Sequence, residues 1–226
     1  MVSNWLAENI VEIFGAVTGI AYVILEIKRH IWLWPLGIVT SAVYIYVFAS
    51  NGFYANMGLQ GYYLVISVYG WYAWRMAQGA ELMAQGTQGA KRRSPAKRDG
   101  AEGSKRRSPA KREGPGSGTD IMRIGMKRAI LCLVTTLVLW GLLWIVLDRW
   151  TDSPVPVWDS LIASMSVVAT WMLTRKYLEQ WYVWIVANVI ATVVYLASGL
   201  FPTAVLFFVY FVMAIVGVRA WSGSRQ

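Results

Sequence analysis

Long uncharged apolar stretches alternate with short polar segments along this chain. The stretches from Leu131 to Leu147 and from Phe201 to Val218 contain no charged residue. A run of about 18 apolar residues is long enough to span a bilayer as a helix. The runs are continuous rather than alternating, which favours helices over a membrane barrel. The pattern therefore predicts seven spans, near residues 10–28, 32–50, 54–77, 126–147, 156–174, 179–198 and 201–221.

Basic residues gather at one end of these predicted spans. With seven spans, Lys28–Arg29, Arg75, Arg175–Lys176 and Arg219 all fall on the same side, and Arg149 falls on the other. An excess of Lys and Arg marks the cytoplasmic side of a membrane protein. We therefore expect the N-terminus outside and the C-terminus in the cytoplasm.

A long basic segment interrupts the apolar pattern at residues 78–125. It is rich in Gly, Ser, Pro, Lys and Arg, and KRRSPAKR occurs in it twice, at 91–98 and 105–112. Such a composition cannot bury a core, so it predicts a disordered cytoplasmic linker. Its charge suits anionic membrane lipids. Nucleic acid is the less favoured partner, and a solvated tether is the simplest interpretation.

The two halves of the chain repeat each other at a fixed offset. Trp181 follows Trp34 by 147 positions, and Gly217 follows Gly70 by the same interval. The repeat predicts two three-helix units, at 8–77 and 155–222, joined by the linker and a linking transmembrane helix at 126–148. Because one span intervenes, both units cross the membrane in the same direction. Parallel repeats of this kind are a transporter architecture, with the solute site near mid-membrane between the units.

The third span is the richest in polar and aromatic residues, and the sixth carries a similar row. In each they recur at spacings of three or four, which places them on one helix face. Polar groups at this depth commonly face a cavity, although amides and hydroxyls also join helices in lipid. The candidate substrate-binding residues are Gln60, Tyr63, Ser67, Trp71, Trp181, Trp184, Asn188 and Tyr210.

Chemistry assigns different roles to these candidates. Gln60 and Asn188 offer directional amide hydrogen bonds, whereas Trp181 and Trp184 offer flat faces for a ring. We therefore expect a small aromatic solute. A sugar site would be richer in amides and carboxylates and poorer in rings.

Tryptophans and glutamates near the span ends are weaker indications of a binding site. We interpret a set of tryptophans as interfacial belt residues, namely Trp32, Trp34, Trp150, Trp158 and Trp221. Glu12 and Glu26 also lie near span ends, which leaves no charged relay at depth. Coupling to ions or protons commonly needs such groups, so we expect uncoupled, facilitated transport.

Enzyme and metal chemistry have little support in this sequence. The chain has one histidine, His30, and one cysteine, Cys132, which do not make a metal cluster. It lacks a phosphate-binding loop, HExxH and GxSxG. We expect no cofactor, no metal and no catalytic residues.

Two motifs resemble those of the PnuC vitamin transporters. QGYYLVISVYGWYAW at Gln60–Trp74 is similar to the Q-x-x-Y…Y-G-W-x-x-W signature of that family, and WYVWIVAN at Trp181–Asn188 is similar to its W-x-x-W-x-x-x-N motif. The resemblance covers about residues 8–77 and 126–221. It implies an all-α membrane protein with the seven-helix, three-plus-one-plus-three layout that the SWEET sugar transporters share.

The same resemblance implies a function. It implies uptake of nicotinamide riboside across the inner membrane of a bacterium, by facilitated diffusion in a homotrimer. Related members carry riboflavin or thiamine. The alternatives that stay open are a transporter of another vitamin or a sugar, and a membrane scaffold that acts through its basic linker.

Overall fold

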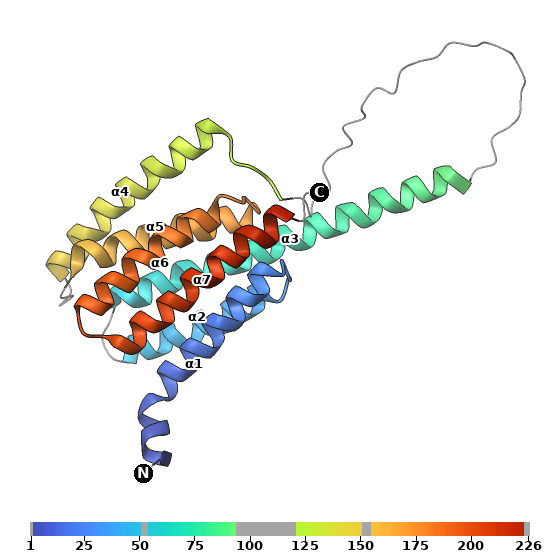
Figure 1. The fold of residues 1–226 in the computed structure, drawn as a ribbon. Coiled ribbons are helices and arrows are strands. Elements are labelled where there is room, and N and C mark those ends of the chain that lie inside the picture. The colour runs from blue at the N-terminus through green and yellow to red at the C-terminus, as the bar shows by residue number, and fades with distance from the viewer. Residues whose placement is uncertain (1, 51–53, 94–120, 151–154, 224–226) are drawn as a thin grey trace, which may run out of the picture.

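The computed structural model describes residues 2–50, 54–93, 121–150 and 155–223 of the chain. Within these residues the chain forms seven helices, drawn in Figure 1: α1 (Val2–Ile27), α2 (Leu33–Ser50), α3 (Tyr54–Arg93), α4 (Met126–Trp150), α5 (Pro156–Thr174), α6 (Gln180–Ala197) and α7 (Phe201–Gly223). Among the described residues, α4 to α7 are long and apolar enough to cross a membrane, and α1 and α2 contain shorter apolar stretches. The predicted all-α membrane fold is confirmed.

The helices pack as two triplets that contact each other through equivalent helices. In the first triplet α2 packs against α1 and α3, and in the second α6 packs against α5 and α7. Between the triplets, α1 packs against α7, and α3 packs against α5 (Figure 1). Each triplet therefore meets the other along its first and third helices, which is the arrangement that two parallel repeats predict.

The turns that end α1 and α5 are alike in detail. Arg29 and Lys176, which occupy matching repeat positions, both have a φ of 53°. The His30 amide donates to the Leu25 carbonyl at 2.9 Å, and the Tyr177 amide donates to the Met172 carbonyl at 3.1 Å. Both helices thus end in the same left-handed capping turn. We call the end of the bundle that carries these basic turns the basic end.

Helix α4 lies outside the two triplets. It packs against α5 (Figure 1), and none of its residues is buried. The Trp140 indole fixes it to α5 through a hydrogen bond to the Val157 carbonyl, 3.0 Å long. An exposed apolar helix of this kind needs a lipid environment or a neighbouring chain, because water would not solvate it.

The start of the linker differs from the prediction. Helix α3 continues to Arg93, well past the predicted span end at 77, and extends beyond the bundle in Figure 1. Residues 78–93 include Ala, Gln, Glu and Met, which favour helix, so basic composition alone misplaced this boundary. Residues 94–120, with all of the second KRRSPAKR, lie outside the described residues.

The end of the linker is packed against the second triplet. Met122 pairs with the loop between α5 and α6, donating to the Lys176 carbonyl and accepting from the Leu178 amide, each at 3.0 Å. The Ile124 amide donates to Glu179 Oε2 at 3.0 Å, and Ile121 is buried. Residues 121–124, which the prediction placed in the linker, are therefore packed against the second triplet.

Candidate functional site

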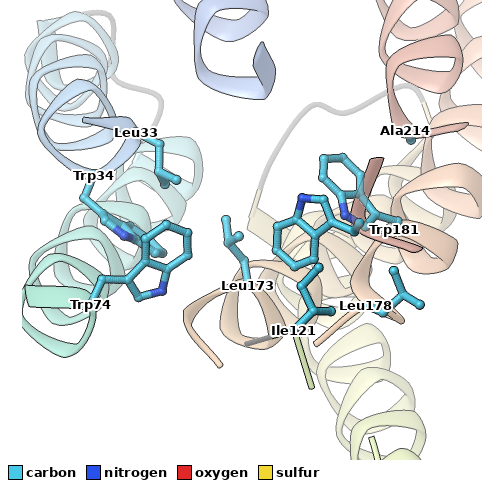
Figure 2. Close-up of a cluster of buried hydrophobic side chains, with 9 residues drawn as sticks. Leu33, Trp34, Trp74, Ile121, Leu173, Leu178, Trp181 and Ala214 are labelled. Carbon is cyan, nitrogen blue, oxygen red and sulfur yellow. The ribbon is translucent and has the colours of Figure 1, made fainter. Parts of the chain in front are cut away.

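Four tryptophans form a layer across the seam between the triplets at the basic end. Trp34 and Trp74 meet edge to face with ring centroids 5.4 Å apart, and Trp181 and Trp221 meet in the same way at 5.6 Å. We call these four residues the tryptophan layer. Figure 2 shows Trp34 with Trp74 on one side, Trp181 on the other, and Leu173 between them.

Burial corrects the interpretation of two of these tryptophans. Trp34 and Trp221 were expected in the interfacial belt, yet both are fully buried. Trp32, Trp150 and Trp158 are exposed, as belt residues would be. A position near a span end does not distinguish a belt tryptophan from a core tryptophan, because both kinds occur at that depth.

A glycine on the neighbouring helix makes room for the indole of Trp34 and for that of Trp181, which we call the inner indoles. A Cβ atom on Gly70 would collide with the Trp34 ring, and one on Gly217 would collide with the Trp181 ring. These glycines occupy matching positions in the repeat, so both triplets use the same close contact between a glycine and an indole face.

Two hydrogen bonds cross the seam within this layer. The Trp74 Nε1 atom donates to the Thr174 carbonyl at 3.3 Å, and the Trp221 Nε1 atom donates to the Ile27 carbonyl at 3.2 Å. Each bond runs from the third helix of one triplet to the C-terminal end of the first helix of the other. Lys176 adds a further contact, since its Nζ atom lies 4.5 Å from the centre of the Trp74 ring. The two triplets are thus fastened together at the basic end.

A second set of polar contacts crosses the seam deeper in the bundle. The Tyr63 hydroxyl lies beside the Ser166 side chain of α5. At the matching repeat positions, the Tyr210 hydroxyl lies against Gly19 of α1, where a Cβ atom would collide with it. Tyr62 donates to the Val167 carbonyl at 2.8 Å.

These contacts lie near the middle of the bundle. Tyr63 is eleven residues from Trp74 along α3, and Tyr210 is eleven residues from Trp221 along α7, or about 16 Å at the helical rise. Half of a bilayer core is about 15 Å. We call Tyr63, Tyr210, Ser166, Gly19 and Asn188 the middle layer.

The remaining candidate residues fall in different surroundings. Asn188 is 5% exposed and lies eight residues along α6 from Gln180, or about 12 Å deep. Ser67 is buried beside Gly37, and Gln60 is half-buried on α3. Trp71, by contrast, is 36% exposed, and the Arg75 guanidinium lies 5.7 Å from its ring centre. The structure does not bring Trp71 together with the other candidates.

Several side chains in and near the tryptophan layer have buried polar atoms with no hydrogen-bond partner among the described residues. An unpaired buried polar group costs about 1–3 kcal/mol, so a cluster of such atoms at a seam indicates a place for a polar ligand. The atoms are Glu26 Oε1, Trp34 Nε1, Thr40 Oγ1, Gln180 Oε1 and Nε2, Trp181 Nε1 and Trp184 Nε1.

Glu26 lies near the end of α1, as the sequence predicted, but it is buried rather than exposed to solvent. Its side chain is 2% exposed. It ends a helix, but the opposite triplet covers that helix end, and a single sequence does not reveal such covering. The side chain of Glu12 lies outside the described residues.

A separate groove lies at the end of the bundle opposite the basic end. It has a volume of about 470 Å³, and α5, α6 and their flanking residues form it, with Trp158, Val189 and Val193 in its lining. Its lining is mostly apolar and includes none of the candidate residues. Lipid chains suit such a surface better than a polar solute.

Comparison with known proteins identifies the family. Residues 9–223 match the family model described as nicotinamide mononucleotide transporter. The chain belongs to this family. It is therefore a membrane transporter rather than an enzyme.

Relatives of known name cover nearly the whole chain. The nicotinamide riboside transporter PnuC of Escherichia coli (strain K12) is 24% identical over 217 residues, spanning 96% of this chain and 86% of that protein. The riboflavin/roseoflavin transporter RibM of Streptomyces davaonensis is 21% identical over 229 residues, spanning 96% of this chain and 92% of that protein. Both relatives are named as transporters.

A solved structure shares the fold. The crystal structure of the vitamin B3 transporter PnuC superposes with a TM-score of 0.64 at 18% identity, covering 98% of this chain and 84% of that one.

Proposed function

We propose that this protein carries nicotinamide riboside across a bacterial inner membrane. The observation that carries the proposal is the pairing of Trp184 and Asn188 on one face of α6. The Trp184 indole N–H has no hydrogen-bond partner in the part of the chain that the structure describes, and Asn188 is buried one turn deeper. The names of the E. coli and vitamin B3 relatives favour the same solute.

The chemistry of the riboside suits these groups. Its pyridinium ring is flat and cationic, and an indole face attracts such a cation by about 0.5–2 kcal/mol. Asn188 and Gln60 are the proposed partners of the carboxamide. The hydroxyls of Tyr63, Tyr210 and Ser67 are the proposed partners of the ribose. Trp181 belongs to the edge of the site, because its ring is already packed between Gly217 and Trp221.

Alternating access by rocking of the two triplets is the proposed mechanism. The tryptophan layer would close the basic end, and the two hydrogen bonds across the seam would hold it closed. Opening would break both bonds and expose the middle layer to the basic side. No ion needs to move with the solute in this scheme, so transport would be facilitated diffusion, with net uptake drawn by phosphorylation of the riboside inside the cell.

The same proposal extends to orientation and assembly. The positive-inside rule favours a cytoplasmic basic end, with the C-terminus inside and the N-terminus outside. A homotrimer in contact with membrane lipids follows from the family resemblance. The exposed apolar surface of α4 supports contacts with lipid or with neighbouring copies.

Riboflavin is the second candidate, and the likeness to RibM favours it. Calorimetric titration of the purified protein with nicotinamide riboside, riboflavin, thiamine, nicotinamide and glucose separates the candidates. Saturable binding of the riboside alone supports the proposal. Binding of riboflavin in its place keeps the transporter and replaces the solute.

A further inference from the structure

Glu26 is a buried carboxylate that the proposed mechanism has not used. Its side chain is 2% exposed, and its Oε1 atom has no hydrogen-bond partner among the described residues. The next residue, Ile27, accepts the hydrogen bond of Trp221 across the seam. Glu26 is therefore level with the tryptophan layer, next to one of the bonds that close the basic end.

Tyr22 connects Glu26 to the deeper polar residues. Tyr22 precedes Glu26 by four residues, so both lie on the same face of α1. The Tyr22 ring borders Gly37, where a Cβ atom would lie 3.2 Å from the ring and 2.8 Å from Ser67 Oγ. Tyr22 is also within electrostatic range of Glu26 and Tyr63. Tyr22 thus lies near Glu26 and near the deeper polar residues of the first triplet.

The repeat places a second polar side chain at the same level. Leu173 occupies the position in the second triplet that matches Glu26, and Gln180 occupies the position that matches Leu33. Leu33 and Leu173 belong to one buried cluster. By the repeat, the pair Glu26 and Gln180 corresponds to the pair Leu173 and Leu33. Both amide atoms of Gln180 are also unpaired among the described residues.

An ionised carboxylate at this depth is costly unless a positive charge compensates it, so Glu26 would carry its charge when a cation lies beside it. The two polar side chains at this level offer one anionic group and one amide, which complement a cationic ring that bears a carboxamide. The aromatic faces beside them add cation–π attraction. These groups therefore match the charge and the hydrogen-bonding pattern of a planar organic cation.

We propose that Glu26 forms a transient binding site, called the station, for the cationic ring of the solute at the basic end, where the tryptophan layer acts as the gate. Gln180 is its uncharged partner. The inference rests on the proposed function and names the group that favours the cation over a neutral analogue. Because Glu26 lies at the gate rather than in the middle layer, opening the seam would bring water to the carboxylate. Hydration weakens a charge pair strongly, so the cation is released instead of being trapped.

Counterflow in proteoliposomes tests this station with two solutes of nearly the same shape. One is nicotinamide riboside, and the other is its uncharged 1,4-dihydropyridine form. Glu26→Gln should lower riboside flux about tenfold or more, as expected for losing a contact to a charged group, and leave the flux of the uncharged form within about twofold. Glu26→Asp keeps the charge and should restore most of the riboside flux.

Gln180→Leu is the matched control, because it copies Leu33 of the first triplet and removes a polar group without removing a charge. It should change both fluxes by the same factor. If Glu26→Gln also lowers both fluxes equally, or lowers neither, the station is disproved. If Glu26→Gln does not fold, Glu26→Leu, which copies Leu173 of the second triplet, replaces it: a loss of riboside flux alone supports the station, and an equal loss of both fluxes, or of neither, disproves it. If the unaltered protein carries neither solute, it is the proposed function that fails.

Discussion

The indole of Trp74 in the first triplet donates a hydrogen bond to the carbonyl of Thr174 in the second, at 3.3 Å. The repeat supplies the reciprocal bond, from Trp221 to Ile27, at 3.2 Å. Two equivalent bonds across one seam resist rocking of the triplets equally on both sides. A conformational change that separates the triplets at the basic end has to break both.

Replacing Trp74 with phenylalanine tests this fastening, because the ring remains and the N–H is lost. A hydrogen bond contributes about 1 kcal/mol, so the open basic end should gain about fivefold in population. The rate at which a cysteine at Ser67 reacts with a maleimide, in a Cys132→Ala background, measures this opening. Trp32→Phe is the control, since Trp32 is 63% exposed and should not change the rate.

The double variant Trp74→Phe, Trp221→Phe extends the same test. The two bonds lie on separate helices and share no partner, so their effects should add and the rate should rise by about 25-fold. A double variant that reacts no faster than either single variant would show that the two bonds do not act as one gate.

The glycine beside each inner indole predicts a sharp stability difference. Gly217→Ala should lower the unfolding free energy by about 1–3 kcal/mol, because its Cβ collides with the Trp181 ring. Gly141→Ala on α4 is the matched control, since its Cβ would meet nothing within 4 Å, and it should stabilise the helix by up to about 1 kcal/mol. Thermal unfolding in detergent compares the two. Equal melting temperatures would contradict the close contact.

Asn188 should contribute to solute binding without supporting the fold. Asn188→Ala should weaken riboside binding by about 1–3 kcal/mol, because the carboxamide loses its partner in a dry site. Calorimetry of the folded variant measures the loss. Tyr182→Ala on the exposed side of the same helix should leave affinity unchanged, and an unchanged affinity in Asn188→Ala would remove that residue from the site.

The basic linker should be dispensable for transport. A short Gly-Ser bridge in place of residues 95–117 keeps the helical end of α3 and the Ile121–Ile124 segment that pairs with the α5–α6 loop. Flux in proteoliposomes should therefore persist. Loss of flux in a folded variant would favour a role for the linker in the membrane protein's activity.

The sequence predicted the helices and their pairing because both depend on local apolar runs and on a repeat that one chain contains twice. It did not predict which tryptophans are buried. Trp34 and Trp32 are two residues apart, yet only Trp34 points at Gly70, and that contact depends on how α2 packs on α3. The matching of Trp34 with Trp181 was the available signal, since a belt residue needs no repeat partner.

The polar residues of the seam show the same limit. Tyr63 and Tyr210 were predicted from their polarity at depth, but their partners Ser166 and Gly19 were missed. Ser166 and Gly19 occupy matching positions, so the repeat could have singled them out. The burial of Glu26 had no signal in the sequence, because it results from contact with the other triplet.

Uptake of nicotinamide riboside by proteoliposomes that contain the purified protein tests the central claim most directly. We expect saturable riboside flux that needs no sodium or proton gradient and that falls strongly in Trp184→Ala. Absence of riboside flux from a folded, reconstituted protein that carries riboflavin or another solute would contradict the claim.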